Sequence, residues 1–164
     1  MKLLISLIIL STSVSLAAKS RVGEWAAYKY EERSATTTIK GTLIKEIVEI
    51  KRMQSPTGTL ENYLKISEKL LPIGSAPTEI FKWEPESQYL KLWDLNIYLL
   101  KCRFVKKIGK IETLKMSAGK ITTCHVKDQN SWVGAVPFNH VLYIQDDENL
   151  FRRLELHKFS WKKK

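Results

Sequence analysis

Alternation of hydrophobic and polar residues in the last third of the chain predicts a run of β-strands. In Leu150–Phe159, three leucines fall on one face, and Arg153, Glu155 and His157 fall on the other. The same period of two, interrupted at turn-forming residues, predicts four more strands in this region. Their ranges are Ile111–Met116, Lys120–Val126, Ser131–Val136 and Val141–Gln145. Antiparallel strands in succession make a meander, and the rest of the chain has to pack against it.

Three short segments are predicted to end or connect these strands. Ser117–Gly119 is a tight turn, in which Gly119 supplies the positive φ that the turn requires. Pro137 interrupts the pattern because proline cannot donate a hydrogen bond to a neighbouring strand. Asp146–Glu148 is a polar hairpin turn.

The first third of the chain also has the character of strands. Gly23–Arg33 carries aromatic and small residues on both faces, which indicates that neither face is fully exposed to water. A second extended segment begins at Thr36–Ile39 and continues through Leu43–Arg52, with Gly41 as a turn or bulge between them. In the straight strand Leu43–Arg52, alternation places Ile44, Val48 and Ile50 on one face.

The middle of the chain gives a weaker pattern. Gln54–Gly58 is a loop, and the segment after it fits both helical and strand spacing; we expect a strand over about Glu61–Ser67, with the choice between strand and helix open up to Leu71. Pro72–Pro77 has the composition of a long connection. Ile80–Trp83 is either a short strand or a loop that lays two aromatic side chains on the core.

One segment favours a helix. Within Trp93–Phe104 and the leucine before it, four residues repeat at spacings of three and four, and Asp94 lies near the helix N-terminus, where a negative charge is favourable. These residues are Leu92, Leu95, Leu99 and Cys102. The helix is expected to end before Gly109 and to deliver Cys102 to the predicted hairpin.

The first residues have the layout of a secretory signal peptide. Leu3–Leu10 is an apolar run preceded by a lysine, and Ser15–Ala17 places small residues where signal peptidase requires them. We expect residues 1–17 to be removed, with cleavage after Ala17 or Ala18. The apolar run is shorter than the ~20 residues that a membrane-spanning helix needs. The sequence therefore predicts a periplasmic or secreted protein without a transmembrane anchor.

Removal of the signal peptide leaves residues 18–164, a length that suits a single β-rich domain with a short basic tail at 162–164. The whole chain has 27 Lys and Arg against 17 Asp and Glu, a formal net charge of +10. A basic chain favours anionic membrane surfaces or nucleic acid. Export and the lack of a binding motif argue against nucleic acid. The candidate contact with an anionic membrane surface is the tail Lys162, Lys163 and Lys164.

The two cysteines, Cys102 and Cys124, are expected to form a disulfide because the chain is exported to an oxidising compartment. The alternative is a nucleophilic cysteine with His125 as its base. Neighbouring residues on a strand point to opposite faces, so Cys124 and His125 cannot face one another.

No constellation for metal binding or catalysis stands out. Three histidines, at 125, 140 and 157, are spread over different predicted strands and match no zinc spacing. Asp146–Glu148 lacks the alternating ligands and the glycine of a calcium loop. Neither a phosphate-binding loop nor a GxSxG or dinucleotide-binding motif is present. We expect no cofactor, no metal and no enzymatic activity.

The C-terminal strands resemble a pattern in small, uncharacterised exported proteins of Gram-negative bacteria. Those proteins share a hairpin of the form aGtfxtC, followed by WvgxVPfgiv and a closing lELxxf strand, and this chain has AGKITTC, WVGAVPFNHV and LELHKF in the same order. The opening Val22–Tyr28 also resembles their first strand. The chain departs from the pattern at Lys120, Ile121 and Asn139. The matching positions are Ala118, Gly119, Thr123, Cys124, Trp132, Val133, Val136, Pro137, Phe138, Glu155 and Leu156.

The resemblance implies a fold similar to the half-barrels of periplasmic lipoprotein carriers, in which a curved antiparallel sheet surrounds an apolar hollow closed by helix. We therefore expect a mostly β protein: a curved antiparallel sheet, as half-barrel or open barrel, with one or two helices. The resemblance carries no functional residue over to this chain.

Together these features predict a non-catalytic binding protein for a lipid, a lipidated protein or another apolar ligand. The expected pocket is partly open, lies beside the helix and is lined from the neighbourhoods of four aromatic residues. They are Trp25, Tyr28, Trp132 and Phe138. The alternative is an envelope-associated protein-interaction or structural module with a filled core.

Overall fold

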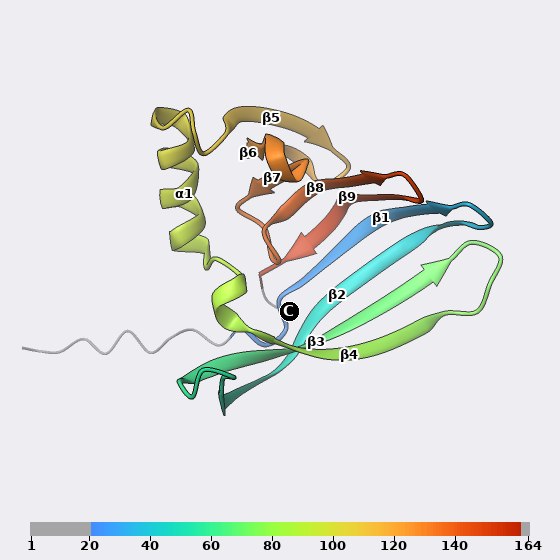
Figure 1. Ribbon diagram of the computed structural model, residues 1–164, viewed down its shortest axis with the longest axis horizontal. Coiled ribbons are helices and arrows are strands. Elements are labelled where there is room, and N and C mark those ends of the chain that lie inside the picture. Colours follow the sequence, from blue (N-terminus) through green and yellow to red (C-terminus); the bar gives the residue numbers. More distant parts are fainter. Residues whose placement is uncertain (1–20, 162–164) are drawn as a thin grey trace, which may run out of the picture.

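The structure, a computed structural model, describes residues 21–161. The expected signal peptide, its cleavage site and the tail Lys162–Lys164 lie outside the described residues. Within 21–161 the chain forms one antiparallel sheet of nine strands and one α-helix (Figure 1). The prediction of a mostly β protein built on an antiparallel sheet with one or two helices is confirmed. The sheet is open, because its two outermost strands do not pair.

The strands follow the order β4-β3-β2-β1-β9-β8-β7-β6-β5 across the sheet. The first four are β1 (Trp25–Ser34), β2 (Thr38–Gln54), β3 (Leu60–Pro72) and β4 (Thr78–Pro85). The others are β5 (Lys110–Met116), β6 (Gly119–Val126), β7 (Ser131–Gly134), β8 (His140–Asp147) and β9 (Leu150–Ser160). The helices are α1 (Leu92–Phe104) and the short 3₁₀ turns η1 (Glu86–Gln88) and η2 (Lys127–Gln129).

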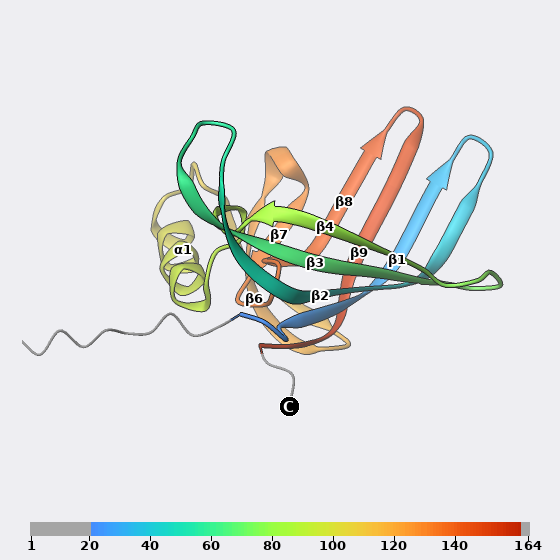
Figure 2. The same ribbon diagram turned by 90° about the horizontal axis from the view of Figure 1, so that it is seen from below.

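Two meanders meet at the centre of this sheet. The first runs from β1 to β4 and the second from β5 to β9, and they join where β1 pairs with β9. The chain passes from one outer strand, β4, to the other, β5, through η1 and α1. The two wings of the sheet are inclined towards one another, and α1 stands at one end of the sheet (Figures 1 and 2).

Irregularities in strand pairing accompany the curvature of the sheet. Between β1 and β9 the register shifts so that His157 is an extra residue, and between β2 and β3 Val48 is the extra residue. A third shift lies between β7 and β8. An extra residue bends its strand and increases the local twist. Val48 also corrects a prediction: the bulge reverses the alternation, so Ile44 and Ile50 lie on opposite faces of β2.

The core lies on the inner face of the sheet. Tyr28, Ile47 and Leu156 are fully buried there, together with Val136 and Phe138 from the loop between β7 and β8. The Tyr28 hydroxyl donates a hydrogen bond to the carbonyl of Pro137, at 3.4 Å. One end of the inner face is therefore filled by protein side chains.

The loop that enters the core explains why the strand expected over Ser131–Val136 stops at Gly134. Residues 134–139 form a tight turn, held by a hydrogen bond of 2.9 Å from the Gly134 N–H to the Asn139 carbonyl. Phe138 and Asn139 both have positive φ, 61° and 65°, which is uncommon for residues with a side chain. This conformation turns Phe138 inward, where it packs edge-on against Tyr89 with ring centroids 5.5 Å apart.

Three other predictions are refined by the structure. The ambiguous segment is strand, and it is longer than expected, over all of β3. Gly41 is neither a turn nor a bulge but lies inside the continuous strand β2, where an added Cβ would lie only 2.3 Å from the Leu71 carbonyl oxygen. Asp146 and Asp147 belong to β8, which leaves the hairpin turn to Glu148 and Asn149.

The predicted helix and disulfide are confirmed. Helix α1 begins one residue earlier than expected and buries Leu95 and Cys102. Cys102 is bonded to Cys124 of β6, with the two Cα atoms 6.0 Å apart. The bond anchors α1 to the second meander. In the part of the chain that the structure describes, no helix has the length and apolar composition needed to cross a membrane.

Asn139 holds the connection between β4 and α1 against the core. Its amide, oriented to match its neighbours, donates to the Leu90 carbonyl at 3.1 Å and accepts from the Leu90 N–H at 3.0 Å. Asn139→Ala should lower the free energy of unfolding by about 1–3 kcal/mol, because it leaves these backbone groups without their partners. Urea denaturation measures this loss, with Asn149→Ala, in the exposed β8–β9 turn, as the control. If both changes lowered the free energy of unfolding equally, the hydrogen bonds between Asn139 and Leu90 would not account for the loss.

Candidate binding hollow on the inner face

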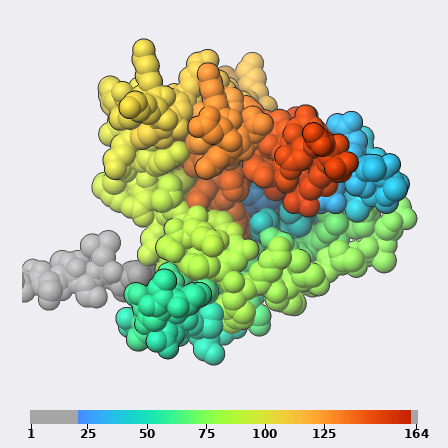
Figure 3. Space-filling view, in the orientation of Figure 1, coloured from blue at the N-terminus to red at the C-terminus, as the bar shows by residue number. Residues whose placement is uncertain are grey.

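Beyond the filled core, the inner face of the sheet opens into a hollow of about 320 Å³. In the space-filling view it lies between the red β8–β9 hairpin and the green β4, with β1 and β2 at its floor (Figure 3). Strands β4 and β9 both line it although three strands separate them in the sheet, so the sheet curves around this space. The lining residues are Tyr30, Leu43, Lys45, Glu68, Leu70, Thr78, Ile80, Lys82, Arg152 and Leu154.

Strand register explains how these distant residues come together. Leu43 pairs with Leu70, and Leu70 pairs with Thr78, so one row of side chains crosses β2, β3 and β4. The next row inward contains Lys45, Glu68 and Ile80, which are paired in the same way. Paired residues in an antiparallel sheet point to the same face. The hollow therefore has an apolar outer row and a charged row closer to the core.

Glu68 is the centre of the charged row. Its carboxylate lies 2.7 Å from the Lys45 ammonium and 2.7 Å from the Lys82 ammonium, and only 11% of its side chain is exposed. Burial by itself opposes ionisation of this carboxyl, but the two lysines outweigh burial and hold the pKa of Glu68 below its ordinary value. Lys82 pairs with Ile66 one row further inward. If Lys82 is included in the charged row, two cations against one carboxylate give this row a net positive charge.

Arg152 forms a second charged group at the edge of the hollow. Its guanidinium donates to one oxygen of Glu32, with distances of 2.9 Å from Nε and 2.7 Å from Nη2. The Tyr30 hydroxyl donates to the same oxygen. Burial, followed by this hydrogen bond to Glu32, raises the pKa of Tyr30 to about 12. Tyr30 therefore stays neutral and presents its ring to the hollow.

His140 is the one histidine in this region, at the start of β8. Burial, helped by the nearby positive charge of Lys45, lowers the pKa of its imidazole to about 4. Its Nδ1 lies 3.0 Å from the Ser131 hydroxyl. A neutral imidazole with a serine hydroxyl suggests a nucleophile and its base. However, Ser131 is 1% exposed and neither residue lines the hollow, so the pair is not part of this candidate site.

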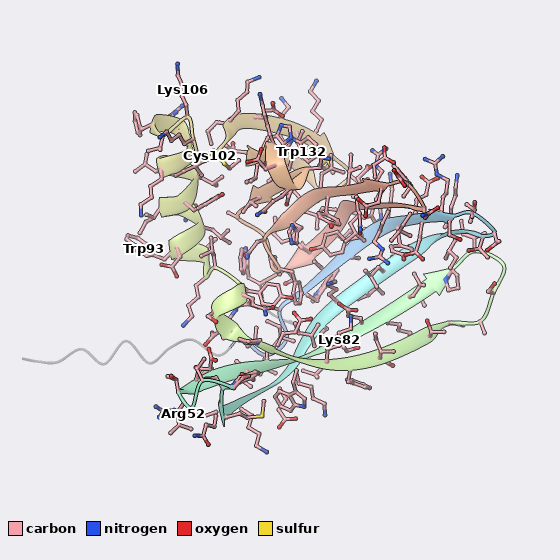
Figure 4. All side chains as sticks on the ribbon, viewed as in Figure 1. Arg52, Lys82, Trp93, Cys102, Lys106 and Trp132 are labelled. Atoms are coloured by element: carbon pink, nitrogen blue, oxygen red, sulfur yellow. A yellow bond between two sulfur atoms is a disulfide. The ribbon has the colours of Figure 1, made fainter. Side chains whose placement is uncertain are left out.

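The four aromatic residues predicted to line a pocket have different positions. Tyr28 and Phe138 meet in the filled core. Trp25 lies on the opposite face of β1 from Tyr28, since the two are three residues apart. Trp132 is half-buried near β5 (Figure 4), where its indole N–H donates to Glu112 at 3.0 Å and its ring stacks on His125 at 3.9 Å. None of the four lines the hollow, and a pocket beside α1 stays a prediction.

Sequence reasoning missed the hollow because its lining is mostly aliphatic and charged, with Tyr30 as its one aromatic residue. A signal was present: Lys45, Glu68 and Lys82 sit among aliphatic residues on strands that otherwise show an apolar face. Ionisable residues of opposite sign on three neighbouring strands could have indicated paired charges on one face. Detecting them required the strand register.

The described residues show no arrangement typical of a metal centre, since 21–161 contain no group of three or more His, Cys, Asp or Glu side chains that could hold an ion. Comparison of the chain with known protein families, with curated proteins and with solved structures found no match. The physical features of the hollow are therefore the basis for a functional proposal.

Proposed function

We propose that this chain is an exported, non-catalytic binding protein, in the periplasm or outside the cell. Its ligand has an apolar chain and a small polar or anionic end, as in a fatty acid, a lipid or the lipid anchor of a protein. The observation that carries the proposal is the hollow on the inner face, which combines aliphatic side chains with a net positive charged row.

The size and lining of the hollow support an amphipathic ligand of modest size. Ligand sites usually have volumes of roughly 300–1,000 Å³, so about 320 Å³ suits one acyl chain better than a whole phospholipid. Leu43, Leu70, Ile80 and Leu154 offer apolar contacts near the edge of the sheet. A carboxylate or phosphate on the ligand would be attracted by Lys45 and Lys82, which share a single carboxylate partner.

A fluorescent fatty acid tests this proposal. We expect it to bind the purified protein with micromolar affinity and to be displaced by unlabelled fatty acid. Leu154→Asp should weaken this binding at least tenfold, because it places a negative charge among the aliphatic side chains that contact the acyl chain.

The matched control is Leu60→Asp, which makes the same chemical change at the exposed start of β3, where the leucine is 59% exposed. Far-ultraviolet circular dichroism of both variants checks that the sheet is retained. Equal affinity of the wild type and Leu154→Asp would rule out this hollow as the binding site.

A protein-interaction module is the second candidate function, and the outer strand β4 favours it. Its Phe81 and Trp83 side chains are 57% and 39% exposed, and the Lys65 ammonium lies 5.4 Å and 5.8 Å from their ring centroids. An unpaired edge strand with exposed aromatic residues can accept an added strand from a partner. This alternative would be supported if the Phe81→Ser variant no longer captured a protein partner but still bound the fluorescent fatty acid as the wild type does.

A further inference from the structure

The outer side of α1 carries a continuous apolar stripe that no part of the described chain covers. Its members follow spacings of four, three and four residues and are Trp93, Ile97, Leu100 and Phe104. Their exposed fractions are 74%, 38%, 57% and 75%. At about 100° per residue they fall within roughly 60° of arc, on the side opposite to Leu95 and Cys102. Figure 4 shows Trp93 directed away from the sheet and Cys102 directed towards it.

Basic side chains border this stripe. Lys101 and Arg103 lie roughly 70° and 90° to either side of its centre line, and Lys106 and Lys107 follow the helix after Val105. All four are exposed, and none has a carboxylate partner among residues 21–161. Asp94 is the one acidic residue of α1. The stripe is therefore an apolar surface with a strong excess of positive charge at its C-terminal half.

We propose that α1 docks on the surface of an anionic membrane. In this arrangement the helix lies in the plane of the interface, the stripe enters the boundary between headgroups and acyl chains, and the basic residues contact anionic headgroups. Tryptophan at one end of the stripe and phenylalanine at the other suit this boundary, because aromatic rings are favoured there. The helix is about 20 Å long, too short to span the membrane but sufficient to lie on it.

Charge distinguishes a membrane from a second copy of the chain as the occupant. Two α1 helices packed through their stripes would bring eight cations and two carboxylates into one interface, and like charges oppose such association. An anionic lipid surface instead neutralises all four of these cations in each chain.

The disulfide contributes to this surface by keeping the opposite side of α1 on β6. Cys102 is 3% exposed and bonded to Cys124, so the stripe cannot turn inward to join the core. The proposed docking surface on α1 is also separate from the hollow, since no residue of α1 is among the residues that line the hollow. The two proposals can therefore fail independently.

Co-sedimentation with lipid vesicles tests the docking surface, with the full chain and its termini as the cell leaves them in every variant. We expect binding to phosphatidylcholine vesicles that contain phosphatidylglycerol, and much weaker binding to phosphatidylcholine alone. Replacing both Trp93 and Phe104 with serine should weaken partitioning at least tenfold. The control, Ile73→Ser with Phe81→Ser, removes exposed apolar side chains far from α1 and should have little effect.

A charge series separates a local surface from a general attraction of a basic protein to anionic lipid. Changing Lys101, Arg103, Lys106 and Lys107 to glutamine should weaken partitioning by about fivefold for each cation removed. The control quartet, with the same change in net charge, is Lys51, Lys69, Lys115 and Lys120, all of them exposed. Circular dichroism and the free energy of unfolding confirm that each variant remains folded.

Three outcomes would overturn the proposal. One is equal loss of binding in the two quartets, which would indicate unspecific attraction. Another is no binding of the wild type to anionic vesicles. The third is a monomer–dimer equilibrium that the Trp93 and Phe104 changes abolish in analytical ultracentrifugation, which would identify a second copy as the occupant. Leu154→Asp should leave vesicle binding unchanged, so that failure of the hollow and failure of α1 docking are distinguishable.

Discussion

Replacing Cys102 with alanine is expected to lower the free energy of unfolding by about 3 kcal/mol, within a range of roughly 2–5 kcal/mol. The bond joins positions separated by 22 residues, and it is the covalent link between α1 and β6. Without it the unfolded chain gains conformational freedom, and α1 keeps only the packing of its inner side, where Leu95 and Cys102 are the buried residues.

Urea denaturation under oxidising conditions measures this loss. The double change Cys102→Ala and Cys124→Ala should lower the free energy of unfolding by only slightly more than the single change, because both remove the same bond. The small extra loss comes from the packing of the second sulfur. Adding reductant should destabilise the wild type and leave the double variant unchanged. A wild-type midpoint that does not respond to reductant would show that the bond contributes nothing to stability.

Changing Glu68 to glutamine is expected to destabilise the protein by about 2 kcal/mol at neutral pH. The change leaves Lys45 and Lys82 side by side without their shared carboxylate. Loss of one partner from a fully buried pair typically costs 3–5 kcal/mol, and the smaller value reflects the partial exposure of both lysines, 19% and 47%. Glu49→Gln, in β2, should have little effect, because the Glu49 side chain is 51% exposed, against 11% for Glu68, and lies 3.7 Å from Lys65.

The pH dependence identifies the carboxylate as the cause. The pKa of Glu68 is lower in the folded protein than the ordinary value of 4.5, so the stabilisation by Glu68 is present above that value and is lost as the pH falls through the folded pKa. The difference between wild type and Glu68→Gln should therefore shrink below about pH 4.5. His140 has a pKa of about 4 in the folded protein and an ordinary value of 6.5. As the pH falls from 6.5 the unfolded state therefore binds the proton first, which lowers the stability of both proteins.

The same variant also bears on the hollow. Glu68→Gln removes the negative charge that offsets two lysines, so the affinity for a fatty acid carrying a carboxylate should increase, while the affinity for an uncharged ester of the same chain should not. A difference of this kind requires that the polar end of the ligand lies at the charged row. Equal changes for both ligands would place the polar end elsewhere.

The sequence by itself determined the secondary structure of most of the chain, because that information is local. The alternation of apolar and polar residues predicted β9 and the two faces of β1. The spacing of apolar residues predicted α1 to within one residue. Glycine and proline marked turns such as the one that ends at Gly119, with φ of 112°, although Gly41 lies inside β2. Pairing of the two cysteines followed from their number and from the expected export.

Only the tertiary structure decided which face each residue occupies and what the faces form. An extra residue at Val48 or His157 reverses the alternation, and no local pattern announces it. The join between β1 and β9 brings together segments more than 100 residues apart in sequence, and the hollow is lined by residues from both sides of this join. For α1, sequence spacing identified the side that carries Leu95 and Cys102, but the exposed stripe on the opposite side became apparent only in the structure. The disulfide and packing against β6 settled that Leu95 and Cys102 face inward and that Trp93 and Phe104 face outward, because a helix of this width can bury only one side against a single sheet.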